Sequence, residues 1–365
     1  MLWKGLKMHK KGTFFFRCDG NSHIGSGHIM RCLALADNAA DQGYECCFLT
    51  AGNEFEKIIH NHKHKRIVLN TDYGRLDNDL NYTINLVKIH KPKALFVDSY
   101  LVNDFYLHFL HCACALIQTM LIYIDDILSF PYSCDLLLNY NIYAQDKEDE
   151  YRVLYKKKNM LEIPDLLLGT SYAPLRKEFQ GLPERIVKKV ATNILVSTGG
   201  ADFLHLGLAL VHEVINNNEM LATLHFDIIV GLLNEDVKEI ISLTAKIPNI
   251  SIHRNITQMS ILMQKCDVAI SAAGSTLYEL CATQTPTITF ILADNQILGA
   301  ESFEKYGVLK NSGDVREKGN EEAAKELIKN ATELSQDYKE RKRIAGIQRT
   351  IIDGMGAQRI IAKLH

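Results

Sequence analysis

The sequence has almost no net charge, because 41 lysine and arginine residues are balanced by 43 aspartate and glutamate residues in a chain of 365. Without a basic excess, the molecule has no overall field to hold a nucleic-acid backbone, and we expect no nucleic-acid partner. Long apolar runs are also lacking. The longest, residues 115–124, is interrupted by a glutamine and a threonine and is far shorter than the about 20 residues that a spanning helix needs. No membrane span is predicted.

The start of the chain lacks the apolar core of a signal peptide. Residues 1–11 are rich in lysine, and the three phenylalanines at positions 14–16 are too few to form such a core. We interpret this segment as a soluble tail, with either Met1 or Met8 as the true start. The nine cysteines are odd in number and lie mostly in apolar segments, which indicates reduced core thiols rather than a disulfide framework. These features predict a cytoplasmic protein.

Metal-ligand spacing is missing as well. Cys112 and Cys114, and the histidines at positions 60, 62 and 64, have no second pair at the spacing of a zinc site. Buried thiols and a solvated polar loop explain these residues better. The sequence therefore predicts neither a metal nor a cofactor.

What the chain does contain is an alternation of short β-rich runs with amphipathic stretches, without short repeats or low-complexity tracts. Such alternation indicates βα units and parallel sheets. A helix after the first strand has apolar residues at steps of four, three and four from Ile29 and stops near Gly43. In the first half, strands are predicted at residues 13–18, 45–49, 66–69, 94–97 and 120–124.

The second half repeats this pattern after a charged segment, residues 176–192, which contains Gly181 and Pro183 and reads as a linker or a domain-edge helix. We expect two Rossmann-like α/β domains, residues 1–180 and 181–365, that face a central cleft. Strands are predicted at residues 193–197, 225–230, 249–253, 268–270 and 286–290, and helices at residues 204–215, 258–265, 275–283, 323–331 and 357–364.

The turn after the first strand is a candidate site, because parallel sheets bind ligands at the carboxyl ends of their strands. Gly25 and Gly27 would let the backbone approach a ligand, and His28 opens the next helix. The helix dipole favours the neutral, base-competent imidazole, whereas a nearby diphosphate favours the charged one. The alternative is that His28 only packs or caps a tight turn. Because Met30 stands where a third glycine belongs, this is not the dinucleotide fingerprint.

A second candidate site lies between the strand predicted at residues 268–270 and a helix. Gly274, Ser275 and Thr276 would present backbone N–H groups at a helix start, where a phosphate can bind. Glu279 lies four residues after Ser275 on the same helix face, where it could accept hydrogen bonds from ribose hydroxyls. A capping box would need an acid at Tyr278, so capping does not explain Glu279, although a solvated surface glutamate stays possible.

Two further turns follow predicted strands. Gly199 and Gly200 could close over the same phosphates or could form a simple glycine turn. Asp98 and Tyr100 end a strand and are expected to face the same cleft as His28. Their alternatives are that Asp98 caps the next helix and that Tyr100 packs.

Seven ordered segments resemble one family, the UDP-2,4-diacetamido-2,4,6-trideoxy-β-L-altropyranose hydrolases of pseudaminic acid biosynthesis. The resemblance runs from about Gly12 to the end of the chain. It implies a glycosyltransferase-B architecture, similar to the lipid-linked N-acetylglucosaminyltransferase of peptidoglycan synthesis. The segments are GSGHIMRCL (25–33), VDSY (97–100), IDD (124–126), CDLLLN (134–139), GTSYAPLR (169–176), GGAD (199–202) and DGMGAQR (353–359).

The resemblance also implies roles for individual residues. His28 would be the catalytic base in the first domain, with Tyr100 at the substrate and Asp19 orienting the imidazole. Water would attack C1 of the sugar with inversion and release UDP, which the second domain holds, and hinge closure would accompany binding. The expected substrate and UDP contacts are Gly25, Gly27, Arg31, Gly199, Gly200, Gly274, Ser275, Thr276, Glu279, Asn295 and Gln296.

Three other functions stay open. A glycosyltransferase with a lipid acceptor would need a membrane-facing patch, and no clear basic amphipathic stretch supplies one. A hydrolysing UDP-N-acetyl-sugar 2-epimerase would need acid and base carboxylates around C2. A non-catalytic nucleotide-sugar-binding protein needs no base such as His28. The expected partner is a small nucleotide sugar, and the sequence identifies neither its stereochemistry, nor a protein partner, nor an oligomeric state.

Overall fold

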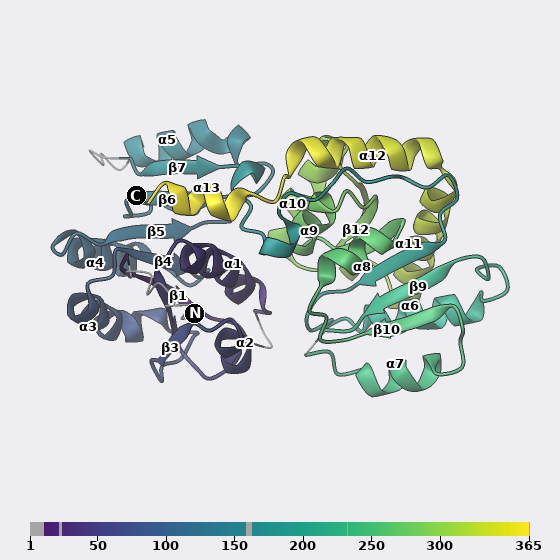
Figure 1. Ribbon diagram of the computed structural model, residues 1–365, viewed down its shortest axis with the longest axis horizontal. Helices are drawn as coiled ribbons and strands as arrows, with labels where there is room; N and C mark the ends of the chain where they lie inside the picture. The colour runs from purple at the N-terminus through teal and green to yellow at the C-terminus, as the bar shows by residue number, and fades with distance from the viewer. Residues whose placement is uncertain (1–10, 22–23, 158–162, 232, 365) are drawn as a thin grey trace, which may run out of the picture. The chain divides into compact units, whose positions relative to one another are not determined.

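The computed structural model describes residues 11–21, 24–157, 163–231 and 233–364 (Figure 1). The expected tail and both candidate starts, Met1 and Met8, lie outside these residues. The chain forms two compact units. The first extends to Lys177 and takes up the chain again from Met355, and the second is Glu178–Gly354. Each unit is built on one parallel sheet.

The first unit has a seven-stranded sheet in the order β3-β2-β1-β4-β5-β6-β7, with every pair parallel. The order reverses between β1 and β4: from β1 the chain builds the sheet toward one edge, and from β4 it builds the sheet toward the other. The strands are β1 (Thr13–Cys18), β2 (Glu45–Thr50), β3 (Lys65–Val68), β4 (Ala94–Asp98), β5 (Met120–Ile124), β6 (Leu136–Asn139) and β7 (Asp165–Leu168).

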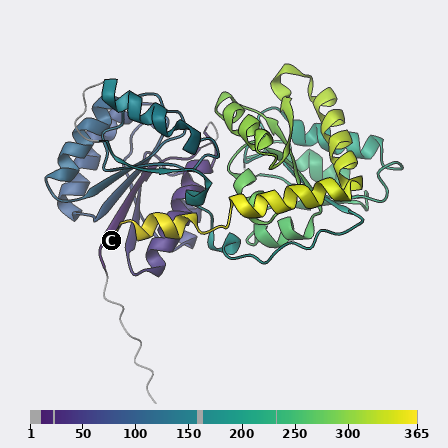
Figure 2. The ribbon, with the colours of Figure 1, turned by 90° about the horizontal axis from the view of Figure 1, so that it is seen from above.

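Helices cover both faces of this sheet (Figure 2). On one face, the rings of Phe16 and Phe96 stack with centroids 4.8 Å apart. On the other, Phe15 packs in a buried cluster with side chains of α3 (Leu80–His90) and α4 (Asp104–Ala115). Because both faces are buried, β1 contains three successive phenylalanines, at positions 14–16, instead of an alternating pattern. The remaining helices are α1 (Gly27–Asp41), α2 (Glu56–Asn61), α5 (Glu148–Lys157) and α13 (Gly356–Ala362).

The second unit has a six-stranded sheet in the order β10-β9-β8-β11-β12-β13, again fully parallel and with a reversal between β8 and β11. Helices α6 and α11 pack against each other over its apolar face. The strands are β8 (Asn193–Ser197), β9 (His225–Ile229), β10 (Ile250–His253), β11 (Val268–Ala272), β12 (Thr287–Ile291) and β13 (Lys310–Asp314). The helices are α6 (Leu206–Asn216), α7 (Val237–Thr244), α8 (Met259–Lys265), α9 (Thr276–Ala282), α10 (Asp294–Lys305), α11 (Asn320–Gln336) and α12 (Tyr338–Ile351).

The prediction of two Rossmann-like α/β units is confirmed, and every predicted strand forms within one or two residues of its expected ends. Some elements of the described chain were given no range by the sequence: the strands β6, β7 and β13, and the helices α2, α3, α4, α5, α7, α10 and α12. β6 and β7 are only four residues long. β13 has the sequence Lys-Asn-Ser-Gly-Asp, which contains no apolar residue, and it forms because the edge of β12 supplies its backbone partners. Such pairing leaves no periodic signal in the sequence.

The C-terminal boundary of the expected second domain is wrong, because the chain from Met355 onward folds with the first unit. There α13 packs beside α1 and against the 3₁₀ turn Thr170–Tyr172. Gly356 allows this close approach, since a Cβ at this position would overlap the backbone of Ala173. An apolar helix face can pack on either domain, so sequence periodicity could not have assigned α13.

The cysteines are placed as the sequence indicated, as thiols that lie mostly in the core. All nine are free thiols, and only Cys112 is exposed. Among the described residues, no helix combines the length and the apolar character that crossing a membrane requires. The apolar run at residues 115–124 is divided instead between the end of α4 and strand β5.

Candidate active site

In the first unit, the loops after β1 and β4 flank the point where the strand order reverses, which is where doubly wound sheets bind ligands. The loop after β1 closes through paired backbone hydrogen bonds of 2.9 and 3.2 Å between Asn21 and Gly25. Gly25 has φ of 73°, a left-handed conformation that favours glycine. A Cβ at Gly27 would meet nothing within 4 Å. The loop thus delivers His28 to the first turn of α1 with open space beside Gly27.

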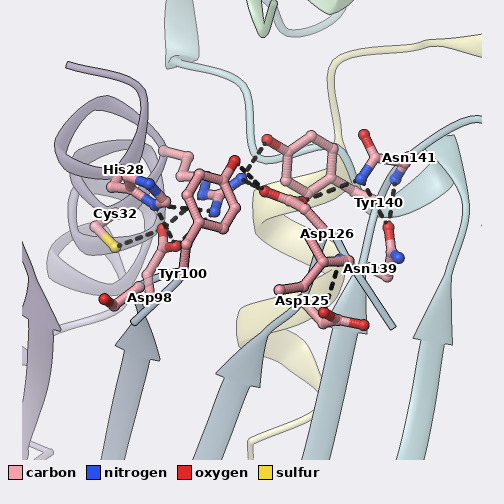
Figure 3. A network of polar contacts seen from close by, with 12 residues as sticks. His28, Cys32, Asp98, Tyr100, Asp125, Asp126, Asn139, Tyr140 and Asn141 are labelled. Carbon is pink, nitrogen blue, oxygen red and sulfur yellow. Dashed lines mark hydrogen bonds and ion pairs between the residues drawn. The ribbon is translucent and has the colours of Figure 1, made fainter. Parts of the chain in front are cut away.

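His28 is paired with Asp98, the last residue of β4 (Figure 3). The distance between His28 Nδ1 and Asp98 Oδ1 is 2.6 Å, and the two residues are only 4% and 1% exposed. Arg31 Nη2 also lies 3.1 Å from Nδ1, but it already donates to Asp98 Oδ1 at 2.5 Å. The shorter contact of Nδ1 is to a carboxylate, which can only accept, so we assign the proton to Nδ1 and leave Nε2 as the nitrogen that can take one up. A buried carboxylate that holds an imidazole in this tautomer is the arrangement found in general-base catalysis.

Arg31, one turn further along α1, holds Asp98 from the other side. Its Nε donates to Asp98 Oδ2 and its Nη2 donates to Oδ1, each at 2.5 Å. Burial acts to raise the pKa of the Asp98 carboxyl, but the charges of Arg31 and His28 and the hydrogen bonds from both outweigh it and hold the pKa well below its usual range. Asp98 is therefore ionised beside His28 at neutral pH.

The next loop, after β5, adds a second carboxylate. Asp126 Oδ2 accepts from Arg31 Nη1 at 2.8 Å and from the hydroxyl of Tyr100 at 2.9 Å. Asn141, after β6, donates to Asp126 Oδ1 at 3.1 Å. The ring of Tyr100 meets His28 edge-on, with centroids 4.6 Å apart. The structure thus brings His28 and Tyr100 together, as the sequence predicted, and adds Asp126 and Asn141 from neighbouring loops (Figure 3).

Asp125 fixes the loop that carries Asp126. Its side chain is fully buried and accepts from the backbone N–H of Ile127 at 2.9 Å and from the hydroxyl of Tyr132 at 2.8 Å. Tyr151 donates to its other oxygen. Burial raises the pKa of this carboxyl although these hydrogen bonds act to lower it. Because the buried Asp125 anchors the loop, its neighbour Asp126 is held where it contacts Arg31.

The prediction that Asp19 orients His28 is wrong. Asp19 accepts from Arg17 Nη1 at 2.6 Å and from the backbone N–H of Ala51 at 2.7 Å. Arg17 is completely buried on β1 and needs carboxylate partners, and Asp19 is one of them. Asp98 takes the orienting role instead. Its place at the end of a predicted strand is the sequence signal that could have pointed to it, and the structure adds that this strand, β4, lies directly beside β1.

The predicted phosphate seat lies at the corresponding reversal of the second sheet, after β11. Ser275 precedes α9 as its N-cap without a side-chain capping bond, and a Cβ at Gly274 would meet nothing within 4 Å. One detail differs from the prediction: the N–H of Gly274 donates to the carbonyl of Ala272 at 2.8 Å and is not presented to a ligand. Ser275 is exposed and Thr276 is half-buried, so these two residues remain the predicted seat, with half-buried Glu279 one turn further on.

The other predicted contacts lie on the same carboxyl edge of the second sheet. Gly199, after β8, has φ of 94°, and Gly200 beside it is exposed. Asn295 and Gln296 begin α10, after β12. Asn295 is exposed, whereas Gln296 Oε1 accepts the backbone N–H of Leu292 at 2.8 Å and so also stabilises the start of the helix. The binding roles of these residues stay predictions.

The histidine-rich segment that raised the question of a metal binds a carboxylate instead. His62 Nδ1 and His64 Nε2 each lie 2.8 Å from an oxygen of Asp37 on α1. Burial acts to raise the pKa of Asp37, but hydrogen bonds and charge from the two histidines lower it to about 2. Within the described ranges, no three histidine, cysteine or acidic side chains are grouped as metal ligands.

Comparison with known proteins agrees with this fold. The model of the glycosyltransferase family 28 C-terminal domain matches residues 193–350. The crystal structure of Acinetobacter baumannii MurG superposes with a TM-score of 0.63 at 13% identity, over 97% of this chain and 99% of that one. The protein therefore has the glycosyltransferase-B architecture that the sequence predicted.

Two curated relatives have names that state a particular activity. The chain is 31% identical over 202 residues to the UDP-2,4-diacetamido-2,4,6-trideoxy-β-L-altropyranose hydrolase of Campylobacter jejuni, which is 54% of this chain and 64% of that protein. It is 47% identical over 58 residues to a Helicobacter pylori protein named as a pseudaminic acid cytidylyltransferase and the same hydrolase, which is 16% of this chain and 11% of that protein. The chain thus matches less than two thirds of the length of either relative.

Proposed function

We propose that this protein hydrolyses a UDP-linked 2,4-diacetamido-2,4,6-trideoxy sugar to UDP and the free sugar, as a cytoplasmic step of pseudaminic acid biosynthesis. The observation that carries the proposal is the buried His28–Asp98 pair at the reversal point of the first sheet. A protein that only binds nucleotide sugars has no use for such a base. The names of the Campylobacter and Helicobacter relatives support the choice of substrate.

In the proposed reaction, His28 Nε2 takes a proton from a water molecule as the water oxygen bonds to C1 of the sugar. The bond between C1 and the diphosphate oxygen breaks, and the configuration at C1 inverts. Asp98 keeps the imidazole in the required tautomer and stabilises the positive charge that it gains. The exposed edge of Tyr100, beside the imidazole, is placed to contact the sugar or the water.

The second unit would hold the nucleotide. The match to the glycosyltransferase family 28 C-terminal domain covers the predicted contacts of the second unit, from Gly199 to Gln296. UDP is a good leaving group, so backbone N–H groups at Ser275 and Thr276 that stabilise growing negative charge would suffice without a strong acid. Glu279 would accept the ribose hydroxyls. We expect the reaction to need neither a metal nor a cofactor.

A direct test is to incubate the protein with a panel of UDP-sugars in H₂¹⁸O, without acceptor and with EDTA. The proposal expects UDP release, ¹⁸O at C1 of the free sugar and an inverted anomer by NMR. His28→Asn should lower the rate about 10²- to 10⁴-fold while leaving the Kd for UDP unchanged. Appearance of ¹⁸O in UDP, normal turnover by His28→Asn, or no release from any sugar would refute the proposal.

The match to a glycosyltransferase domain favours one alternative, a transferase in which an acceptor hydroxyl replaces water. The same assay separates the two, because a transferase releases UDP rapidly only when an acceptor is added. A hydrolase releases UDP at the same rate with and without acceptor.

A further inference from the structure

Arg31 was expected to contact the substrate or UDP, yet its guanidinium is engaged within the first unit. The residue is only 8% exposed. Nε and Nη2 donate to the two oxygens of Asp98, while Nη1 donates to Asp126 at 2.8 Å and to the hydroxyl of Tyr140 at 2.9 Å. Every nitrogen of the side chain thus has a protein partner. A phosphate could bind here only by displacing a carboxylate or Tyr140.

The contacts of Arg31 complete a ring of interacting side chains (Figure 3). His28 contacts Asp98, Asp98 contacts Arg31, and Arg31 contacts Asp126. Asp126 accepts from Tyr100, whose ring returns to the edge of His28. Arg31 is the member of the ring that binds both carboxylates, so it connects the orientation of the base to the orientation of Tyr100.

We propose that Arg31 is a positioning residue, which holds Asp98 against His28 and Asp126 against Tyr100 and does not bind UDP. The catalytic meaning of this role rests on the proposed hydrolase function. The structural part, the effect of Arg31 on the His28 imidazole, can be measured without any turnover.

The chemistry of the side chain explains why an arginine occupies this position. A guanidinium presents five N–H groups in a rigid plane and can grip one carboxylate with two parallel hydrogen bonds while a third reaches another. Its charge lies between Asp98 and Asp126 and compensates both buried carboxylates. Burial acts to lower the pKa of Arg31, but the charges of Asp126 and Asp98 raise it well above its usual value. A lysine ammonium would keep the charge but could not make this planar double contact.

Arg31→Lys tests the proposal, because the two possible roles predict opposite results. For a positioning residue, kcat should fall by about 100-fold, as expected for a misplaced base, while the Kd for UDP measured by calorimetry stays within about twofold. We expect the NMR signal of the His28 Nδ1 proton at low field in the wild type because of the bond to Asp98, and this signal should shift or broaden in the free Arg31→Lys enzyme. A residue that binds phosphate predicts a weaker Kd for UDP and an unchanged His28 signal, and either result would overturn the proposal.

Arg17→Lys is the matched control. Arg17 is also buried on the first unit and also bridges two carboxylates, Asp19 and Asp79, but it has no contact with His28. This variant should lose comparable stability and leave the His28 signal at its wild-type position. If both variants move the signal equally, general loosening of the unit explains the effect and the positioning role is refuted.

Asp126→Asn provides a second test should Arg31→Lys not fold. It weakens the connection to Tyr100 and keeps the double contact between Arg31 and Asp98. The proposal expects a lower kcat, an unchanged Kd for UDP and a retained His28 Nδ1 signal. An unchanged kcat would overturn it. If the His28 signal responds to Arg31→Lys but the wild type hydrolyses no UDP-sugar, the proposed function fails and the positioning role stands.

Discussion

Replacement of Asp98 by asparagine tests the central pair of the first unit with the smallest change of shape. The carboxylate accepts from His28 Nδ1 at 2.6 Å, whereas an amide nitrogen in its place would donate to Nδ1. The imidazole would then carry its proton on Nε2 and could no longer act as a base. The equivalent change in a serine protease triad lowers kcat about 10⁴-fold. Because UDP leaves readily, we expect a loss of roughly 10²- to 10⁴-fold, or about 3–5 kcal/mol in the barrier.

The same change also has a cost in stability. Asp98 is fully buried with Arg31, and breaking a buried ion pair typically costs about 3–5 kcal/mol. Since Arg31 keeps its ion pair with Asp126 at 2.8 Å, we expect the lower end, about 3 kcal/mol. For a unit of this size, that corresponds to a decrease in Tm of roughly 6–12 °C. Kinetics at 25 °C should therefore report on folded enzyme.

Asp79→Asn is the matched control for this experiment. Asp79 is a buried carboxylate of the same unit that accepts from Arg17 at 2.6 and 3.0 Å and from the hydroxyl of Tyr106 at 2.9 Å, whereas His28 is paired with Asp98. It should lose similar stability in urea unfolding and keep its kcat for UDP release. A folded Asp98→Asn enzyme with kcat within about tenfold of wild type would refute the tautomer argument, as would an equal loss in Asp79→Asn.

Three further predictions concern other parts of the chain. Glu279→Ala should weaken UDP affinity by about tenfold in calorimetry, as the loss of a hydrogen bond to ribose predicts, and an unchanged Kd would remove Glu279 from the nucleotide site. The lowered pKa of Asp37, about 2 against about 3.9 when unfolded, stabilises the fold above pH 4, and this stability is lost as the pH falls toward 2. Urea unfolding at pH 5 and pH 2.5 should therefore show a smaller decrease for Asp37→Asn than for wild type, and equal decreases would contradict this. Gly356→Ala, whose Cβ overlaps backbone, should destabilise the first unit by about 1–3 kcal/mol in thermal unfolding, and an unchanged Tm would contradict the close packing of α13 at this position.

Elements with an apolar period were predictable, and elements made by pairing alone were not. The buried strand β1 contains three successive phenylalanines and is followed by a helix with an apolar stripe at helical spacing, so its type follows from local sequence. β13 has no such run and depends on its neighbour β12. The last helix, α13, was recognised as a helix but assigned to the wrong unit, because an amphipathic face specifies burial and not the partner that buries it.

The residues of the candidate site also fall into those that the sequence could predict and those that it could not. His28 and Tyr100 were found because glycine spacing and the end of a strand mark the carboxyl edge of a parallel sheet. The orienting carboxylate was misassigned to Asp19, which is adjacent to the glycine turn in sequence, while Asp98 lies 70 positions away from His28. Asp126 was noted only within the family segment IDD (124–126) and was given no role, since a carboxylate after a strand has no pattern that distinguishes it from a surface residue.

By itself, the sequence determined the class of fold and the edge of each sheet where chemistry would be found. Alternation of buried strands and amphipathic helices is a local property, and the right-handed crossovers of parallel strands make the topology follow from it. Only the tertiary structure decided which carboxylate orients His28, which arginine connects the two acids, and where α13 packs. These are contacts between residues distant in sequence, and they are settled by the need of each buried charge for a partner, which no local pattern records.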